Sequence, residues 1–595
     1  MSDVAATPPP EEVQATFCAT LVDEWVRCGV TSAVVAPGSR STPLALALAA
    51  RAEVSVEVHV DERAAGFIAL GIGLATGHPA IVLTTSGTAT AHLHAAAIEA
   101  DLARVPLILV TADRPPELQH VAAPQTIGQT RLYGDVVRWF AEPGVAEAAT
   151  SGTWRSLAAR AVAEATTGPA GPGPVHLNLA FREPLVGDAG PLPAGREDAS
   201  RWHTTVGRRT VLDRVGTERV VSLLDDDRGV IVAGEGCGDP EGVLDLAGAT
   251  GWPVLADPRS GCRSWAEVGD DSPVVVAAFD PILRSAVAAE HLAPRVVLRL
   301  GAPPASKVLA AWLRDVDAVE VTVDAHGRWF DADHRAAHVL HADPTTVCRA
   351  LACTVGGRHG SEAWAARWRR AESVAQAAID DAGHRGPAHR AWRGPGDRAR
   401  APGRCVVGRV VLDARPRPRV VRRPGARRPR LANRGANGID GVMSTAVGVA
   451  IAGRSTGAST AVLLGDAAFL HDSTALIGIA QREIDLTIVV IDNDGVGSSR
   501  SSAGCGAGWG SLRAALRHPA RCRPLGAGGG PRPGHGGTGR SGRRRHSDRC
   551  QRRRRWRAVG AGGHGSGGQR RAPRAHPRPR GPTPRRRARR LSSQA

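Results

Sequence analysis

The sequence predicts an α/β protein with three doubly wound domains, each built on a parallel β-sheet that carries helices on both faces. Three observations lead to this fold class. The chain has 595 residues, which is too many for one hydrophobic core. Amphipathic helical segments alternate with short apolar runs rich in β-branched residues, as strand–helix–strand units require. Stretches rich in proline, glycine and aspartate interrupt the alternation and mark domain boundaries.

The first domain is expected over residues 12–195. It begins with an amphipathic helix over 15–29, and a further helix is expected over 44–50. The segment 184–201 is rich in proline, glycine and aspartate and ends the unit. Four apolar runs predict its strands, at 32–37, 54–60, 80–85 and 106–112.

The second domain is expected over residues 205–355, as a smaller unit of the same kind. A helix over 362–382 then precedes the third domain, whose periodic part covers 431–495. The amino-acid sequence shows no helix or strand periodicity over 384–430 or over 496–595. The strands of the second domain are predicted at 229–234, 253–257, 274–279, 295–301 and 318–323.

Charge and cysteine usage restrict the class of protein. The net charge of +19 is concentrated in the last hundred residues, which are dominated by arginine, glycine and proline. The 10 cysteines occur singly, without CxxC pairs, so we expect reduced thiols. The N-terminus has acidic residues and prolines where a signal peptide needs a basic start, and no apolar run reaches membrane-spanning length. These features predict a cytoplasmic protein that makes no use of a membrane.

Two polar residues follow neighbouring strands of the third domain. Asp466 comes directly after the apolar run 461–464, and Asn493 follows the run 486–491. The interval accommodates strand, helix and strand, so both residues should lie at the carboxyl edge of the sheet, where such folds bind ligands. A carboxylate, an amide oxygen and the carbonyl of Gly495 are hard donors that suit Mg²⁺ and leave positions for phosphate oxygens. The alternative is that these residues only form turns.

Several further motifs have no explanation from periodicity alone. Two of them are APGSRSTP at 36–43 and ANRGANGIDG at 432–441. The others lie at 84–91, 111–118, 122–130 and 299–309. Together with the metal motif, they resemble the 2-succinyl-5-enolpyruvyl-6-hydroxy-3-cyclohexene-1-carboxylate synthase family, thiamine-diphosphate enzymes of menaquinone biosynthesis. The resemblance covers about residues 12–380 and 431–495.

The resemblance implies roles for particular residues. Glu62, which follows the strand run 54–60, would contact the aminopyrimidine ring of thiamine diphosphate and support the acid–base step that activates it. Gln125, Gly438 and Ile439 would lie beside the cofactor, with Ile439 supporting its bent conformation. The metal, Mg²⁺ or Mn²⁺, would be held by Asp466, Asn493 and Gly495. The substrate carboxylates would be held by Ser39, Arg40, Arg114, Lys307 and Arg434.

The family's reaction gives the expected function. Thiamine diphosphate would decarboxylate 2-oxoglutarate, and the resulting carbanion would add to isochorismate to form the product that names the family. Both substrates are dicarboxylates, which explains the need for fixed arginines with planar paired donors. The resemblance also implies a homodimer or homotetramer, with the active site between the first domain of one chain and the third domain of its partner.

Two stretches of the third domain look as if they were written in a shifted reading frame. One permitted set of codons for residues 410–419, read from the second nucleotide, gives Ser-Ser-Ser-Thr-Pro-Val-Arg-Asp-Leu, a segment that the family carries there. Residues 497–502 can likewise be coded so that the third frame reads Ile-Phe-Ser-Phe-Leu. The sequence therefore predicts a third domain partly corrupted by frameshifts, and a chain that is inactive as written.

Two other interpretations remain open. The arginine-rich end could be a disordered arm that binds nucleic acid through phosphate charge, although aromatic residues for base stacking are almost absent from it. The chain could also be a thiamine-diphosphate enzyme of the acetohydroxyacid synthase type, which explains the metal motif but accounts less well for the runs SRSTPL and NRGANGIDG.

Overall fold

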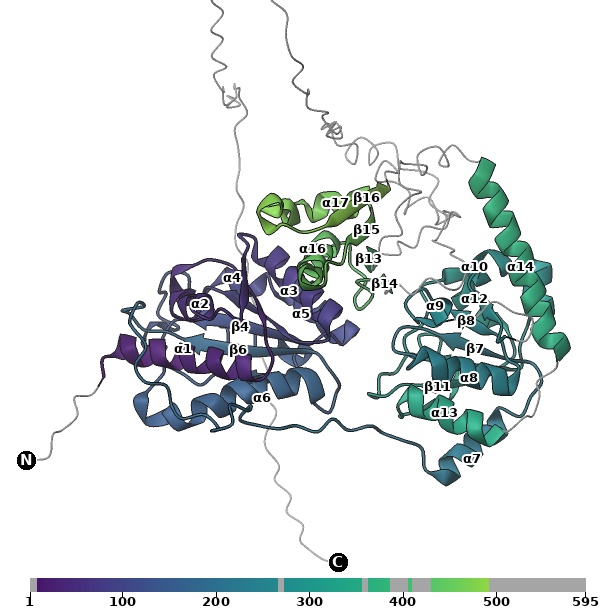
Figure 1. The fold of residues 1–595 in the computed structure, drawn as a ribbon, viewed down its shortest axis with the longest axis horizontal. Helices are drawn as coiled ribbons and strands as arrows, with labels where there is room; N and C mark the ends of the chain where they lie inside the picture. The colour runs from purple at the N-terminus through teal and green to yellow at the C-terminus, as the bar shows by residue number, and fades with distance from the viewer. Residues whose placement is uncertain (1–7, 266–271, 356–361, 386–404, 409–429, 492–595) are drawn as a thin grey trace, which may run out of the picture. The chain divides into compact units, whose positions relative to one another are not determined.

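The structure is a computed structural model that describes residues 8–265, 272–355, 362–385, 405–408 and 430–491. It contains three parallel β-sheets, each with helices packed on its faces (Figure 1). The expected α/β class with three domains is confirmed. No helix among the described residues is both long enough and apolar enough to cross a membrane.

The N-terminal sheet has six parallel strands in the order β2-β1-β3-β4-β6-β5. Its central strands β3, β4 and β6 are buried along their whole length, as strands covered on both faces must be. The strands are β1 Ser32–Val35, β2 Ser55–Val58, β3 Ala80–Thr84, β4 Leu107–Asp113, β5 Trp139–Ala141 and β6 Pro174–Ala180. The α-helices are α1 Pro10–Arg27, α2 Thr42–Ala49, α3 Glu62–Thr76, α4 Thr88–Ala91, α5 His94–Ala103 and α6 Trp154–Thr167.

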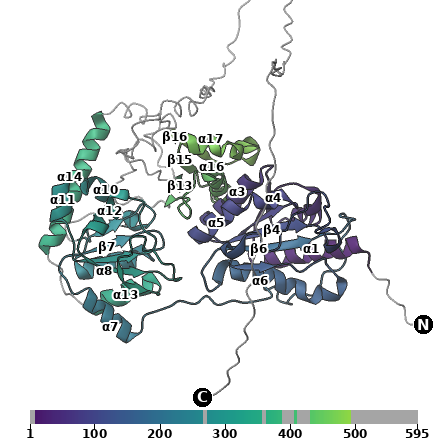
Figure 2. The same ribbon diagram turned by 180° about the vertical axis from the view of Figure 1, so that it is seen from behind.

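Helices α1, α2 and α6 cover one face of this sheet, and α3 and α5 cover the other (Figures 1 and 2). Helix α1 begins earlier than the sequence predicts, because Pro10 occupies its first turn together with two glutamates that favour a helix N-terminus. The short 3-10 helices of this domain are η1 Ser39–Ser41, η2 Pro116–Leu118, η3 Gly134–Val136 and η4 Ala148–Thr153.

The middle sheet also has six parallel strands, in the order β12-β11-β10-β7-β8-β9. Helices α7, α8 and α13 pack on one face, and α10, α12 and α14 pack on the other. The strands are β7 Gly229–Ala233, β8 Val254–Ala256, β9 Val275–Val276, β10 Val296–Leu300, β11 Val319–Val323 and β12 Ala336–Leu340. The helices are α7 Arg214–Leu223, α8 Pro240–Thr250, α9 Cys262–Trp265, α10 Phe279–Ile282, α11 Ala286–His291, α12 Lys307–Asp315, α13 Pro344–Val355 and α14 Glu362–Arg385.

The third sheet has four parallel strands in the order β14-β13-β15-β16. Strands β15 and β16 pair along their whole length, so the predicted strand–helix–strand unit is confirmed. Strand β13 lies within 384–430, where the sequence showed no periodicity. The elements are β13 Cys405–Gly408, β14 Arg430–Leu431, α16 Val442–Gly453, η5 Arg454–Thr456, β15 Thr460–Gly465, α17 Asp466–His471, η6 Ser473–Leu476, η7 Ile479–Arg482 and β16 Leu486–Ile491.

Helix α16 of the third domain packs directly on helix α3 of the first. A Cβ atom added to Gly71 would lie 2.1 Å from the carbonyl oxygen of Thr445, and one added to Gly448 would lie 2.0 Å from that of Ile68. The two backbones therefore approach closely because glycines stand at the crossing. One apolar cluster extends across the contact and includes Phe67, Met443 and Val447.

The two stretches assigned to a shifted reading frame fall mostly outside the described residues. Residues 409–429 and 492–595 contain the recoded segments at 410–419 and 497–502, together with the basic tail.

Candidate active site

Glu62 is the first residue of helix α3, just beyond the carboxyl end of strand β2. The helix begins there because Asp61 accepts a hydrogen bond from the backbone N–H of Ala64 at 3.2 Å, as an N-cap residue does. Glu62 is half-buried. The sheet edge and the helix start therefore fix the backbone of this glutamate and leave its carboxylate accessible.

The third domain carries Asp466 at the start of a helix. Asp466 is half-buried and is the first residue of helix α17, directly after strand β15. At the other end of this short helix, the carbonyl of His471 accepts a hydrogen bond at 2.8 Å from the guanidinium of Arg63, the neighbour of Glu62. The structure thus joins the start of helix α3 to the end of helix α17 within one chain.

Asp472 reinforces this junction, although the sequence did not single it out. It is completely buried and accepts hydrogen bonds from the backbone N–H and hydroxyl of Ser444 at 2.6 and 2.8 Å. Burial raises the pKa of Asp472 to about 6, against the lowering effect of these hydrogen bonds and of Arg63, which lies 3.9 Å away. The carboxylate ties helix α16 to the end of helix α17.

The loop 432–441 carries three of the predicted residues. Arg434 is half-buried and donates a hydrogen bond to the side-chain oxygen of Asn437 at 3.1 Å. Ile439, next to Gly438, leaves 40 % of its surface exposed. At the end of the loop, Gly441 has φ +69° and packs so closely on the ring of Phe67 that no side chain fits. The loop is therefore held against helix α3, which begins at Glu62.

The predicted substrate residues of the first domain lie in two loops. Arg40 is buried and donates to the carbonyl of Phe181 at 2.9 Å and to Glu183 at 2.8 Å. Ser39, next to it in the 3-10 helix, is exposed. Arg114 is half-buried and donates to the carbonyl of Pro124 at 3.1 Å. Both arginines are thus held by carbonyl oxygens of their own domain.

Gln125 lies beside the glycine turn that follows strand β3. It has φ +57°, and its side chain donates to the carbonyl of Ser86 at 3.1 Å. Gly87 has φ +82° and its N–H donates to Gln129 at 2.9 Å, so two glutamines hold this turn. Lys307 is exposed at the start of helix α12 in the middle domain.

A buried polar network supports the carboxyl ends of strands β4 and β6. Asn178 donates to Asp113 at 2.8 Å and accepts from Thr111 at 2.8 Å and from Gln129 at 2.9 Å. Asp113 in turn accepts from the backbone N–H of Arg114 at 2.7 Å, and burial raises the pKa of Asp113 to about 6. The network fixes the backbone from which Arg114 extends. In the sequence, the only sign of this polar network is that polar residues interrupt the apolar runs of these strands.

The predicted metal site is described only in part. Asn493 and Gly495 lie outside the described residues. Within the described ranges, no group of three or more histidine, cysteine, aspartate or glutamate side chains could hold a metal ion. That result does not bear on a site made of one carboxylate, one amide and one carbonyl oxygen.

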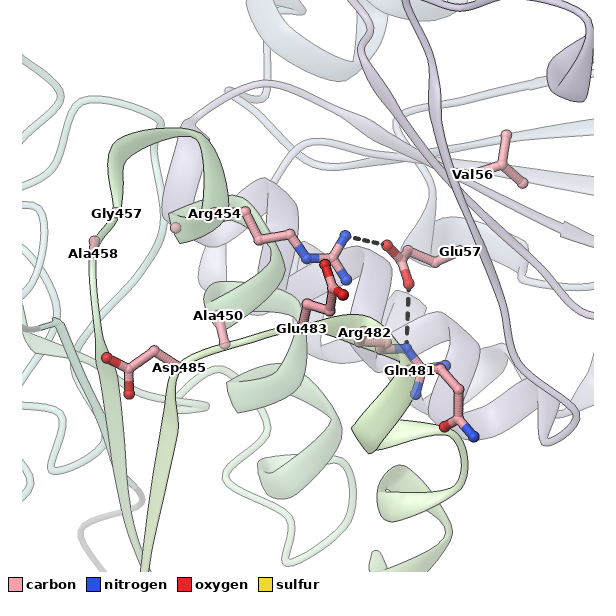
Figure 3. A pocket seen from close by; sticks show the side chains of 11 residues that line it. Val56, Glu57, Ala450, Arg454, Gly457, Ala458, Gln481, Arg482, Glu483 and Asp485 are labelled. Atoms are coloured by element: carbon pink, nitrogen blue, oxygen red, sulfur yellow. Dashed lines mark hydrogen bonds and ion pairs between the residues drawn. The ribbon is translucent and has the colours of Figure 1, made fainter.

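An open cleft of about 550 Å³ also lies between the first and third domains (Figure 3). In it, Glu57 of strand β2 accepts from Arg454 at 2.5 Å and from Arg482 at 3.3 Å. The cleft includes none of the predicted site residues. Because the carboxylate of Glu57 is already paired with both arginines, we interpret this cluster as an ionic contact that joins the domains.

The residues predicted for the site carry groups that suit a ligand with a ring system and a diphosphate. Glu62 offers a carboxylate, Ile439 an exposed apolar side chain, and Asp466 an anionic oxygen for a bridging metal. The side-chain oxygen of Asn433 is buried at the base of the loop and accepts no hydrogen bond from the described part of the chain. A buried acceptor of this kind requires a partner.

Three family models match the chain in order. The model "Thiamine pyrophosphate enzyme, N-terminal TPP binding domain" matches residues 16–132. The model "Middle domain of thiamine pyrophosphate" matches residues 196–386. The model "Thiamine pyrophosphate enzyme, C-terminal TPP binding domain" matches residues 425–507. Thiamine pyrophosphate and thiamine diphosphate are the same molecule.

Curated relatives match most of the chain. A 2-succinyl-5-enolpyruvyl-6-hydroxy-3-cyclohexene-1-carboxylate synthase from Chloroflexus aurantiacus is 40% identical over 506 residues, which is 82% of this chain and 83% of the relative. A protein of the same name from Bacillus velezensis is 37% identical over 492 residues, 81% and 83% of the two chains. One from Halobacterium salinarum is 40% identical over 501 residues, 80% and 82% of the two chains.

Proposed function

This chain belongs to the 2-succinyl-5-enolpyruvyl-6-hydroxy-3-cyclohexene-1-carboxylate synthase family of thiamine-diphosphate enzymes, and from that premise we propose that its substrates are 2-oxoglutarate and isochorismate. The observation that carries the proposal is the match of three thiamine-pyrophosphate domain models in order along the chain, together with 37% to 40% identity to curated synthases over 81% to 82% of its length. One glutamate and one metal-binding aspartate from different domains are the two ends that a bound thiamine diphosphate needs.

Bound thiamine diphosphate supplies the nucleophilic carbon that removes CO₂ from a 2-oxo acid and transfers the remaining fragment to an acceptor. The residues of the chain do the rest. Glu62 holds a proton at the aminopyrimidine ring, and Ile439 and Gln125 border the ring system. Asp466, together with Asn493 and Gly495, would hold the Mg²⁺ or Mn²⁺ that neutralises the charge of the diphosphate. The half-buried setting of Glu62 and Asp466 supports these roles.

The dicarboxylate substrates explain the cations around the site. Arg40 pairs with Glu183, whose side chain is 72% exposed, so a substrate carboxylate can replace that partner without opening the core. Arg114, Arg434 and Ser39 would hold the other carboxylates, and Lys307 would contribute from the middle domain. We also propose a cytoplasmic homodimer or homotetramer, in which the first domain of one chain completes the third domain of its partner.

The experiment is a product assay with isochorismate, Mg²⁺ and thiamine diphosphate, in which the 2-oxo acid is varied. Mass spectrometry should detect 2-succinyl-5-enolpyruvyl-6-hydroxy-3-cyclohexene-1-carboxylate with 2-oxoglutarate and no adduct with pyruvate. The assay should be run on the chain as written and on a version with both proposed frameshifts restored. Condensation of two pyruvate molecules instead would support an acetohydroxyacid synthase and contradict the proposal.

A further inference from the structure

Glu99 of helix α5 makes an unusual set of contacts with the loop 432–441. One oxygen of its carboxylate accepts a hydrogen bond from the backbone N–H of Gly435 at 2.8 Å. The other accepts from the N–H groups of Ala436 at 2.7 Å and Asn437 at 3.3 Å. The side chain is buried, with Glu99 only 3% exposed. Three successive amides of the third domain thus converge on one carboxylate of the first.

The shape of the loop explains this convergence. Asn437 has φ +64°, a left-handed conformation that reverses the chain and turns successive N–H groups toward one point. Such a concavity binds an anion, and here the anion is a side chain of the protein itself. Burial raises the pKa of Glu99 and the three backbone hydrogen bonds lower it, with burial the larger effect.

The backbone of the loop also lies directly on helix α5. A Cβ atom on Gly435 would lie 2.7 Å from the carbonyl oxygen of Glu99 and 2.8 Å from the Cβ atom of Leu102. Only glycine allows this approach, so the carboxylate and the helix surface hold the same point of the loop. The side chain of Arg434 is oriented by its bond to Asn437, which Glu99 also holds.

We propose that Glu99 is a positioning residue, whose carboxylate holds the loop 433–440 so that Arg434 faces the substrate and Ile439 faces the cofactor ring. The proposal rests on the proposed function for the roles of Arg434 and Ile439, while the anchoring of the loop stands on the contacts alone. Glu99 touches neither ligand. It acts through the three amides, all of which donate to its two carboxylate oxygens.

The test uses the full chain with Glu99→Gln and Glu99→Asp. Glutamine has one accepting oxygen, and its NH₂ group would face an N–H donor, so it cannot serve both sides of the turn. Aspartate keeps the charge and both oxygens on a shorter side chain. The matched control is Glu164→Gln on helix α6, which removes a charge from the same domain where Glu164 pairs with Arg160 at 3.2 Å.

The first measurement is hydrogen exchange of the amides of residues 435–437, followed by mass spectrometry. Glu99→Gln should accelerate their exchange at least tenfold, Glu99→Asp should give a smaller increase, and Glu164→Gln should leave it unchanged. Peptides from strand β4 and helix α6 report whether the first domain stays folded. Unchanged exchange at 435–437 in Glu99→Gln, or accelerated exchange throughout the first domain in both Glu99 variants, would overturn the proposal.

The second measurement is calorimetric titration of the same variants, made in the frame-restored protein, with thiamine diphosphate in the presence of Mg²⁺. Glu99→Gln should weaken binding about tenfold, and Glu99→Asp should recover part of the loss. Faster amide exchange at residues 435–437 together with unchanged affinity for thiamine diphosphate would overturn the positioning role of Glu99. If the frame-restored wild type does not bind thiamine diphosphate, the proposed function fails, and the exchange measurement alone then decides whether Glu99 anchors the loop.

Discussion

Asp466 stands where strand β15 ends and helix α17 begins, so the position of its backbone is set by both elements. We predict that Asp466→Ala weakens Mg²⁺-dependent binding of thiamine diphosphate by about 100-fold or more, because even residues that only orient metal ligands contribute 10- to 100-fold. Calorimetry with and without Mg²⁺ measures the effect.

The matched control is Asp485→Ala, an exposed aspartate beside the opposite end of the same pair of strands. That variant should bind the cofactor like the wild type. Equal affinities for Asp466→Ala and the wild type would remove Asp466 from the metal site.

Asp472 gives the stability of the protein a dependence on pH. Burial raises its pKa from 3.8 to about 6 in the folded protein. The folded state therefore binds the proton more tightly than the unfolded state, and this contribution is fully present below pH 4 and lost as the pH rises through 6. Because of Asp472, the free energy of unfolding of the wild type should fall by on the order of 2 kcal/mol as the pH rises between these values. We predict that this fall is absent in Asp472→Asn.

Urea denaturation at several pH values checks this prediction. An asparagine can accept from the N–H of Ser444 and donate to its hydroxyl, so the variant should fold. Parallel pH profiles for the wild type and Asp472→Asn would contradict the raised pKa. Asp485→Asn, at an exposed position, controls for the loss of one negative charge.

At the scale of elements, the crossing of helices α3 and α16 connects the first and third domains. Gly71→Ala would place a methyl group 2.1 Å from the carbonyl oxygen of Thr445. Alanine favours a helix by about 1 kcal/mol relative to glycine, yet we predict a net loss of about 1 to 3 kcal/mol in the free energy of unfolding, because backbone atoms must move.

Urea unfolding followed by circular dichroism measures this loss. Gly152→Ala is the control, since nothing lies within 4 Å of a Cβ atom built there. A Gly71→Ala variant as stable as Gly152→Ala would show that the two helices do not cross as closely as the structure places them.

Sequence patterns predicted some elements better than others for physical reasons. Uniformly apolar strands such as β7 and β8 were predicted because parallel strands buried on both faces contain little else. Strand β6 was not predicted, since His176 and Asn178 interrupt its apolar run with side chains that hydrogen-bond to neighbours inside the core. Strand β12 was missed because it is an edge strand with only partly buried residues.

The residues of the candidate site also differ in how well the sequence predicted them. Resemblance of the motifs predicted roles for Glu62, Asp466 and the loop of Arg434, and these roles stay predictions. The structure adds the contacts of Arg63, Phe67 and Glu99 with the third domain, which the sequence did not predict. Glu99 could not be predicted, because a glutamate within a helix gives no sign that amides more than 300 residues away will bind it. Contacts between domains have no local pattern in the sequence.

At the scale of the whole molecule, the reading frame decides whether the third domain is complete. We predict that the gene, read one nucleotide out of step, encodes Pro-Val-Arg-Asp near codon 416 and Ile-Phe-Ser near codon 498. Restoring both frames should recover synthase activity, and the chain as written should be inactive. Resequencing the gene checks this directly. If neither segment appears in the shifted frames, the arginine-rich end belongs to the protein.

The central claim is that a glutamate of the first domain activates a cofactor whose diphosphate is held by the third. Glu62→Gln separates these two functions, because an amide cannot supply the same proton at the ring, whereas the metal ligands are untouched. The decisive measurement is the exchange rate of the thiazolium C2 proton of bound thiamine diphosphate, followed by nuclear magnetic resonance in the frame-restored protein. The account predicts greatly slowed exchange in Glu62→Gln with nearly unchanged cofactor affinity, and exchange at the wild-type rate would contradict it.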